Sequence, residues 1–190
     1  MRNIQKIIFL ISFSLSFGQK SYQIDKTFWI YEKPENYIYR EDNFSEVISL
    51  GEKFIEENIE NACQDSNDGQ LLLTIAKNED SDLNILIASI SENSNIVKFT
   101  MDGYIDLLSK TLIDGLEKDG TKVDFERDKS QIGSFDFQKL TFNIHYHVKE
   151  YKSIMYIGEI DQKEVKFTII VDNDLDEKLL EDSLIHSSFK

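Results

Sequence analysis

The sequence predicts an α+β protein, an α/β/α sandwich in which a mainly antiparallel sheet is flanked by three helices. Three segments place apolar residues at three- and four-residue steps, the spacing of an amphipathic helix. Between them lie strand-like segments, and the last four are joined by connections too short for parallel pairing. Helices with one apolar face must bury that face, so we expect them to pack on the sheet.

The first residues carry the three-part pattern of a secretory signal peptide. Arg2 and Lys6 supply positive charge, and an apolar run of 11 residues follows at 7–17. That run is too short to span a bilayer, which needs about 20 residues. Small side chains precede a peptidase cut between Gly18 and Gln19. We therefore expect an exported protein, either periplasmic or secreted, without stable membrane insertion after cleavage.

The remaining chain is expected to form one domain. Residues 1–18 are the predicted signal peptide, and 19–190 the predicted globular α/β/α domain. The chain has only one proline, Pro34, and no Gly/Ser-rich linker that would mark an internal boundary. Cys63 is the only cysteine, so an intramolecular disulfide is impossible and stability must come from the core.

The N-terminal half is expected to hold short strands, one helix and then longer strands. Aromatic and β-branched residues favour the early strands, and Asn43 with Glu46 forms a capping box for the helix. We expect short strands at 28–31 and 37–39, a helix whose apolar stripe runs from Phe44 to Ile59, and strands at 71–77, 83–90 and 96–99.

The C-terminal half is expected to hold a helix, an antiparallel meander and a closing helix. Thr100 can cap a helix over 101–118, and Gly120 can end it. The apolar alternation slips by one residue between Phe137 and Leu140, which predicts a β-bulge. We expect tight turns at Lys149-Glu150 and Asp161-Gln162 and a last helix from about Leu175 to Ser188, capped by Asn173 or Asp174.

The formal charge of the chain is −14 at pH 7. An acidic surface of this kind disfavours nucleic acid, whose binding proteins carry a basic footprint. It also disfavours anionic membranes. Two interpretations stay open: attraction of cations or of a basic protein partner, or solubility alone.

The order of elements resembles that of the PsbP-like family, which includes the extracytoplasmic DcrB-type proteins. The resemblance uses the opening FWIYEKPENY at 28–37, the long helix at 101–118, the meander, and the closing segment Leu184 to Phe189. The family pattern often has Gly and Trp after the proline, where this chain has Asn36 and Tyr37. The resemblance implies a non-catalytic accessory or binding role, with no ligand site to carry over.

His145 and His147 are the candidate metal ligands. On a strand they would share a face, and two imidazoles with a carboxylate could bind zinc or copper. The alternative is that both lie on the polar side of an amphipathic strand. His186 belongs to the closing helix and needs tertiary packing to approach them. The acidic run at 172–176 lacks the Gly and Glu of a calcium loop and fits helix capping better.

The aromatic residues Trp29, Tyr31, Tyr37 and Tyr39 are the candidate ligand-binding set. Together with Phe28 they could line a pocket for an apolar ligand or peptide, or they could seal the edge of the sheet. The chain has no nucleophile elbow, no His-Glu-x-x-His motif and no Gly-rich phosphate loop. We therefore expect no enzyme and no cofactor. The hypotheses are an accessory or binding module, an acidic inhibitor or immunity-type protein that masks a basic partner, and a small-ligand or metal carrier.

Overall fold

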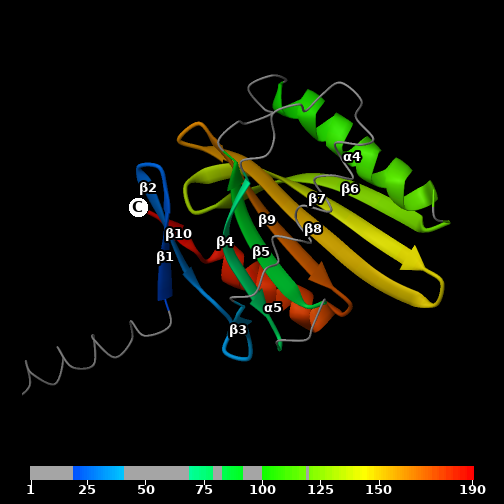
Figure 1. Ribbon diagram of the computed structural model, residues 1–190, viewed down its shortest axis with the longest axis horizontal. Helices are drawn as coiled ribbons and strands as arrows, with labels where there is room; N and C mark the ends of the chain where they lie inside the picture. Colours follow the sequence, from blue (N-terminus) through cyan, green and yellow to red (C-terminus); the bar gives the residue numbers. More distant parts are fainter. Residues whose placement is uncertain (1–18, 41–68, 79–82, 92–99, 119) are drawn as a thin grey trace, which may run out of the picture.

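The computed structural model describes residues 19–40, 69–78, 83–91, 100–118 and 120–190. These residues form two antiparallel sheets and two helices (Figure 1). The elements are β1 (Gln19–Ile24), β2 (Thr27–Glu32), β3 (Ile38–Tyr39), β4 (Gly69–Ala76), β5 (Ile85–Ser91), α4 (Met101–Lys118), β6 (Lys122–Ile132), β7 (Phe135–Tyr146), β8 (Lys149–Ile160), β9 (Lys163–Val171), α5 (Asp174–Ile185) and β10 (Ser188–Phe189).

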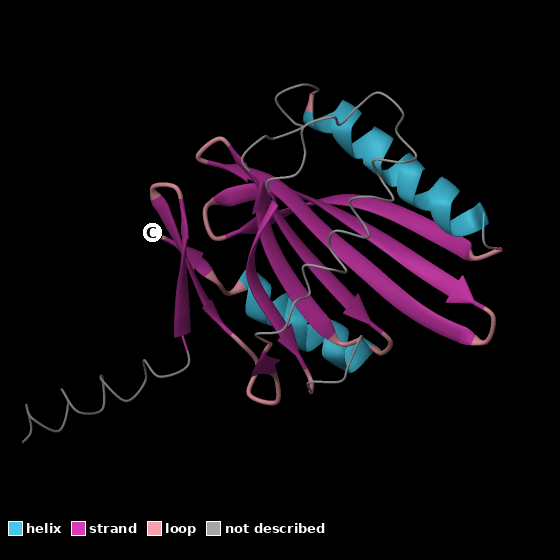
Figure 2. Cartoon of the chain, in the orientation of Figure 1, coloured by secondary structure: helices cyan, strands magenta, loops and turns pink. Residues whose placement is uncertain are grey.

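The larger sheet has seven strands in the order β3-β4-β5-β9-β8-β7-β6 (Figure 2). Every pair of neighbours is antiparallel. Strands β6 to β9 form the expected meander, with two residues between the ends of successive strands. The turn at Asp161-Gln162 is confirmed, and both of its residues have positive φ (52° and 67°), as the turn type that suits a hairpin requires.

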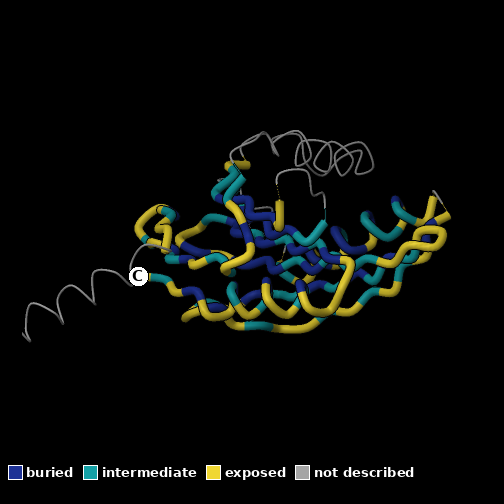
Figure 3. Tube along the Cα trace, turned by 90° about the horizontal axis from the view of Figure 1, so that it is seen from below, coloured by how far each residue is buried: buried dark blue, intermediate teal, exposed yellow. Residues whose placement is uncertain are grey.

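The two described helices cover different parts of opposite faces of this sheet. Helix α4 packs Tyr104, Ile105 and Leu108 against one face of β7 and β8. Helix α5 packs Leu180 and Leu184 against the other face, over β8, β9 and β5. Figure 3 shows the buried positions concentrated in the middle of the molecule, with exposed positions outside it. We call the two sides of the sheet the α4 face and the α5 face.

Strand β7 changes the face on which it is buried. Phe137 belongs to the α5-face core, whereas Leu140 and Phe142 belong to the α4-face core. The register with β6 and β8 is unbroken along β7, so the predicted bulge there is wrong. A register shift lies instead on β4, between Leu71 and Leu73. The slip in alternation arises because each face is buried at a different place along the strand.

A second, three-stranded sheet joins the two ends of the described chain. Strands β1 and β10 both pair with β2, and Phe189 lies opposite Trp29. The closing helix therefore ends at Ile185, three residues before the expected end at Ser188, and the single expected sheet becomes two. Two backbone bonds between Phe28 and Lys190, of 2.8 and 2.9 Å, stabilise this pairing.

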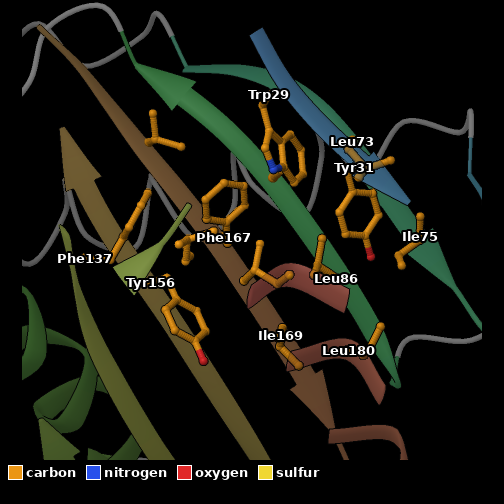
Figure 4. Close-up of a cluster of buried hydrophobic side chains, with 14 of the residues drawn as sticks. Trp29, Tyr31, Leu73, Ile75, Leu86, Phe137, Tyr156, Phe167, Ile169 and Leu180 are labelled. Carbon is orange, nitrogen blue, oxygen red and sulfur yellow. The ribbon is translucent and has the colours of Figure 1, made fainter. Parts of the chain in front are cut away.

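Figure 4 shows how the small sheet closes the α5-face core. The Trp29 and Tyr31 rings reach from β2 to the larger sheet, and the centroid of Trp29 lies 4.8 Å from that of Phe167. The Trp29 indole also donates to the Ser187 hydroxyl at 2.9 Å. The two sheets therefore share one apolar core.

The predicted ends of the helix at 101–118 and the predicted N-terminal cap of the closing helix are confirmed. The Thr100 hydroxyl accepts from the Gly103 backbone at 3.2 Å, and Gly120 has φ +78°. Asn173, rather than Asp174, caps α5. The part of the chain that the structure describes contains two helices, so three flanking helices are not matched there. The expected signal peptide, the helix at 43–59, the strand at 96–99 and Cys63 lie outside the described residues.

A buried carboxylate fixes the N-terminal end of α5. Asp176 is 1% exposed, and the Lys77 ammonium, 2.7 Å away, and the Tyr37 hydroxyl, also at 2.7 Å, both donate to it. Asn173 donates to it at 2.8 Å and accepts from its backbone N–H. Burial by itself raises the pKa of Asp176, but the bonds from Lys77, Asn173 and Tyr37 outweigh it and hold the pKa below its usual value.

We expect Gly158→Ala to destabilise the fold by about 1–3 kcal/mol, because there is no room for the added methyl group. A Cβ at Gly158 would lie 2.7 Å from the Phe137 ring and 3.0 Å from the Asp136 carbonyl. Gly103→Ala is the matched control, since its nearest neighbour would be 3.4 Å away, and it should stabilise α4 by up to about 1 kcal/mol. Urea unfolding measures both; equal stabilities of the two variants would contradict the packing.

We expect Asp176→Asn to lower the free energy of unfolding at pH 7 by about 2–3 kcal/mol. The folded-state pKa is depressed, so the carboxylate stabilises the fold above its unfolded-state pKa, and this contribution disappears as the pH falls through the folded-state pKa. The parent should therefore lose more stability than the variant between about pH 5 and pH 2. Urea titrations across that range test this, with the exposed Asp174→Asn as control. Parallel pH profiles of parent and Asp176→Asn would contradict it.

Candidate functional site

A hollow of about 370 Å³ lies where the N-terminal end of α5 meets the ends of four strands. We call it the acidic cleft. It involves the start of β6, the end of β7, the start of β8, and the loop from β9 into α5. Its lining residues are Asp124, Asn143, Ile144, His145, Glu150, Tyr151, Lys152, Val171, Asp172, Asn173, Asp174 and Glu177.

The charge of the acidic cleft is strongly unbalanced. Five of its lining residues are carboxylates, and only Lys152 and His145 can oppose them. The Lys152 ammonium is already paired with Glu177 at 2.5 Å. The cleft therefore keeps a surplus of negative charge that no lining side chain neutralises.

Two of the carboxylates are held in their ionised form by neighbouring donors. The Lys122 ammonium, with a smaller effect from His145, lowers the pKa of Asp124. Hydrogen bonds from Asn173 and Asn84 lower the pKa of Asp172. Because both shifts favour the charged form, these groups stay negative at any pH near neutrality.

His145 lies between two carboxylates at the rim of the cleft. Its Nδ1 is 3.2 Å from Glu150, and its Nε2 is 3.1 Å from Asp124. An imidazole can donate to both only when it carries two protons. The carboxylates bind opposite ring nitrogens, so they do not converge with the imidazole on one point in space. No group of three or more potential metal ligands forms within the described ranges.

The prediction that His145 and His147 share a strand face is wrong, because β7 ends at Tyr146 and His147 lies in the turn. The turn occupies His147-Val148 instead of Lys149-Glu150, and His147 has φ +55°. This left-handed conformation suits the two-residue turn and takes the side chain out of the strand pattern. His186 lies at the C-terminal end of α5, where a ring nitrogen is 2.6 Å from the Asp182 carbonyl oxygen. The three histidines therefore do not meet.

The aromatic candidates lie mainly in the core. Trp29, Tyr31 and Tyr37 are at most 1% exposed, whereas Tyr39 is half-buried with the Lys20 ammonium 3.7 Å above its ring. Burial raises the pKa of Tyr31, whose hydroxyl bonds to Ser183 at 2.9 Å. The arrangement corresponds to residues that seal the junction between the sheets. The acidic cleft and a second hollow of about 520 Å³ beside the C-terminal half of α5 are lined by none of the four.

The sequence contained a partial signal for the acidic cleft. Acidic residues crowd at 172–177, and β6 alternates apolar and acidic side chains. Each of these patterns has an ordinary explanation, as a helix cap or as a solvent-facing strand. Only the pairing of β6, β7 and β8 brings Asp124 and Glu150 beside the first turn of α5.

Comparison with known proteins supports the architecture. No family model and no curated protein sequence matches the chain. The solution structure of cyanobacterial PsbP (CyanoP) from Synechocystis sp. PCC 6803 matches it over 91% of this chain and 92% of that chain. The TM-score is 0.52 and the sequence identity is 13%. None of the described helices combines the length and apolarity needed to span a membrane. At this identity the likeness concerns the fold alone: the chain has a mainly antiparallel α+β fold similar to that of PsbP.

Proposed function

We propose that this protein is an exported, non-catalytic accessory module that binds a basic segment of a partner protein in the acidic cleft. The observation that carries the proposal is the surplus of carboxylates around a hollow whose one lysine is already paired. A concave site lined with one sign of charge focuses the field and attracts ligands of the opposite sign.

The fold and the leader support the rest of this proposal. The resemblance to PsbP-like proteins implies an accessory or binding role, and the likeness to the cyanobacterial PsbP structure extends over most of both chains. The charged run, apolar run and small residues of 1–18 support export. A periplasmic and a secreted destination both fit this leader.

The geometry of the cleft favours a lysine or arginine side chain as the bound group. Two of the lining carboxylates come from different elements, Glu150 from β8 and Asp174 from the first residue of α5. Glu150 is 80% exposed, so a partner can reach it without opening the fold. Exposed pairs contribute little each, but complementary charge speeds association and excludes acidic competitors.

The same contact supports a second role, that of an inhibitor or immunity-type protein masking a basic partner. The whole chain has a formal charge of −14, so its surface complements a basic one well beyond the cleft. An inhibitor would abolish the activity of its partner on binding, whereas an accessory module would leave that activity in place. An activity assay of the bound partner separates the two roles.

We expect the processed protein, 19–190, to bind the peptide acetyl-(Lys-Gly)4-amide with an affinity that falls as salt rises. Glu150→Gln with Asp174→Asn should weaken the affinity about threefold or more at low salt, because two exposed ion pairs are lost. Isothermal titration calorimetry measures this change in Kd.

The matched control is Asp114→Asn with Glu117→Gln, which removes two exposed acidic charges from α4, outside the lining of the cleft. Its affinity should stay close to that of the parent. If both double variants lose the same affinity, net charge alone drives binding and the acidic cleft has no special role.

A further inference from the structure

Strand β6 is the open edge of the larger sheet. It is the last strand in the order and has 11 residues, whereas the strand at the opposite edge, β3, has only two. Among the described strands, β7 is the one partner of β6. Edge strands of this length are commonly blunted by a proline, a bulge or a covering element. β6 contains no proline, and its register with β7 has no shift.

The backbone groups that face the open edge can be identified from the hairpin. Ile132 and Phe135 flank the two-residue turn Gly133-Ser134, so they form a mutually hydrogen-bonded pair. Alternate residues of β6, those with even numbers, then bond to β7. The odd-numbered residues direct their N–H and C=O groups outward; these are Val123, Phe125, Arg127, Lys129 and Gln131. The described backbone bonds outside the β6–β7 ladder use none of them.

The side chains beside this edge differ between the two faces of the sheet. Asp124, Glu126 and Asp128 form an exposed acidic row on the α5 face, and Asp124 also lines the acidic cleft. On the α4 face, Val123 and Phe125 are only half-buried at the margin of the core beneath α4. Along 123–128, a strand added at this edge would place alternate side chains against acids on the α5 face and against Val123, Phe125 and Arg127 on the α4 face.

Pairing with a second copy of β6 that is centred on the acidic row does not suit this edge. Antiparallel pairing of two β6 strands about Glu126 would place Glu126 opposite its equivalent and Asp124 opposite Asp128. Like charges directly opposite each other destabilise a strand pair. The charge of the row therefore selects against self-association and in favour of basic side chains.

We propose that β6 captures its partner by strand addition, with an extended segment that alternates lysine or arginine with aliphatic residues. Its basic side chains would face the acidic row and continue toward the acidic cleft, while its aliphatic side chains cover Val123 and Phe125. Backbone bonds along the edge supply affinity, and the alternating side chains supply specificity. This inference rests on the proposed function, because it assumes a basic partner.

The test uses two peptides of equal charge, acetyl-(Lys-Val)4-amide and acetyl-(Lys-Gly)4-amide, with the processed protein. Only the first has the β-propensity and the apolar side that the edge requires. We expect it to bind at least tenfold more tightly. Backbone amide signals of Val123, Phe125 and Arg127 should shift in NMR spectra, since outward N–H groups gain acceptors.

Lys129→Pro removes one outward N–H without touching the ladder with β7, and Lys129→Ala removes the same charge but keeps the N–H. We expect the proline variant to bind acetyl-(Lys-Val)4-amide at least tenfold more weakly than the alanine variant. A peptide with N-methylated valines gives the same test without changing the protein. It should also bind at least tenfold more weakly than its unmethylated form.

The outcomes distinguish strand addition from the acidic cleft. Strand addition would be overturned if the two peptides bound with equal affinity. It would also be overturned if the proline variant bound as tightly as the alanine variant and the methylated peptide as tightly as its unmethylated form. If Glu150→Gln with Asp174→Asn still weakened binding in that case, the proposed function would stand without it. If neither peptide bound the parent protein, both proposals would fail.

Discussion

The buried carboxylate of Asp176 is the constraint on which the rest of the structure depends. Helix α5 buries Leu180 and Leu184 but few other apolar side chains, so apolar contact alone fixes it weakly. Tyr37 and Lys77 lie 139 and 99 residues before Asp176 in the sequence, and both donate to its carboxylate. Similar tyrosine–carboxylate contacts, Tyr104 with Glu164 and Tyr156 with Glu181, attach both helices to the sheet. These hydrogen bonds therefore fix the position of each helix on the sheet, which a small apolar stripe alone would not determine.

The acidic surface follows from how the helices divide the sheet. α4 covers β7 and β8 on one side, and α5 covers β8, β9 and β5 on the other. Away from Ile132 and Phe137, which join the α5-face core, the α5 face of β6 and β7 carries polar side chains such as Glu126 and Asn143. Arg127, which lies on the other face, is bound by Asp102 and Asp106 of α4. Arg127 is therefore engaged on the α4 face. On the α5 face, Lys122 and His145 pair with Asp124 at the end of the acidic row, where the cleft opens.

Local patterns in the sequence predicted the elements whose information is local. The long helix, its Thr100 cap and the four-strand meander all have periods that can be recognised within one segment. The small sheet has no such signal, because Phe189 pairs with Trp29 across almost the whole chain and β10 has two residues. The slip between Phe137 and Leu140 had two explanations with the same pattern, a bulge or a change of buried face. Of the candidate site, the acids of 172–177 were visible, but their meeting with β6 depends on tertiary pairing.

The acidic side chains of β6 allow a long, open edge strand to be present without promoting self-association. A neutral β6 of the same length would offer its outward N–H and C=O groups to any extended chain, including other copies of itself. The row of Asp124, Glu126 and Asp128 repels an acidic segment and forms no ion pairs with an uncharged one. A basic segment gains ion pairs with all three carboxylates, so the row favours it over both. On the other face of such a segment, apolar side chains can pack against the half-buried Val123 and Phe125. The same acidic row therefore has two effects at this edge: it opposes pairing between two β6 strands, and it attracts a basic segment of a partner.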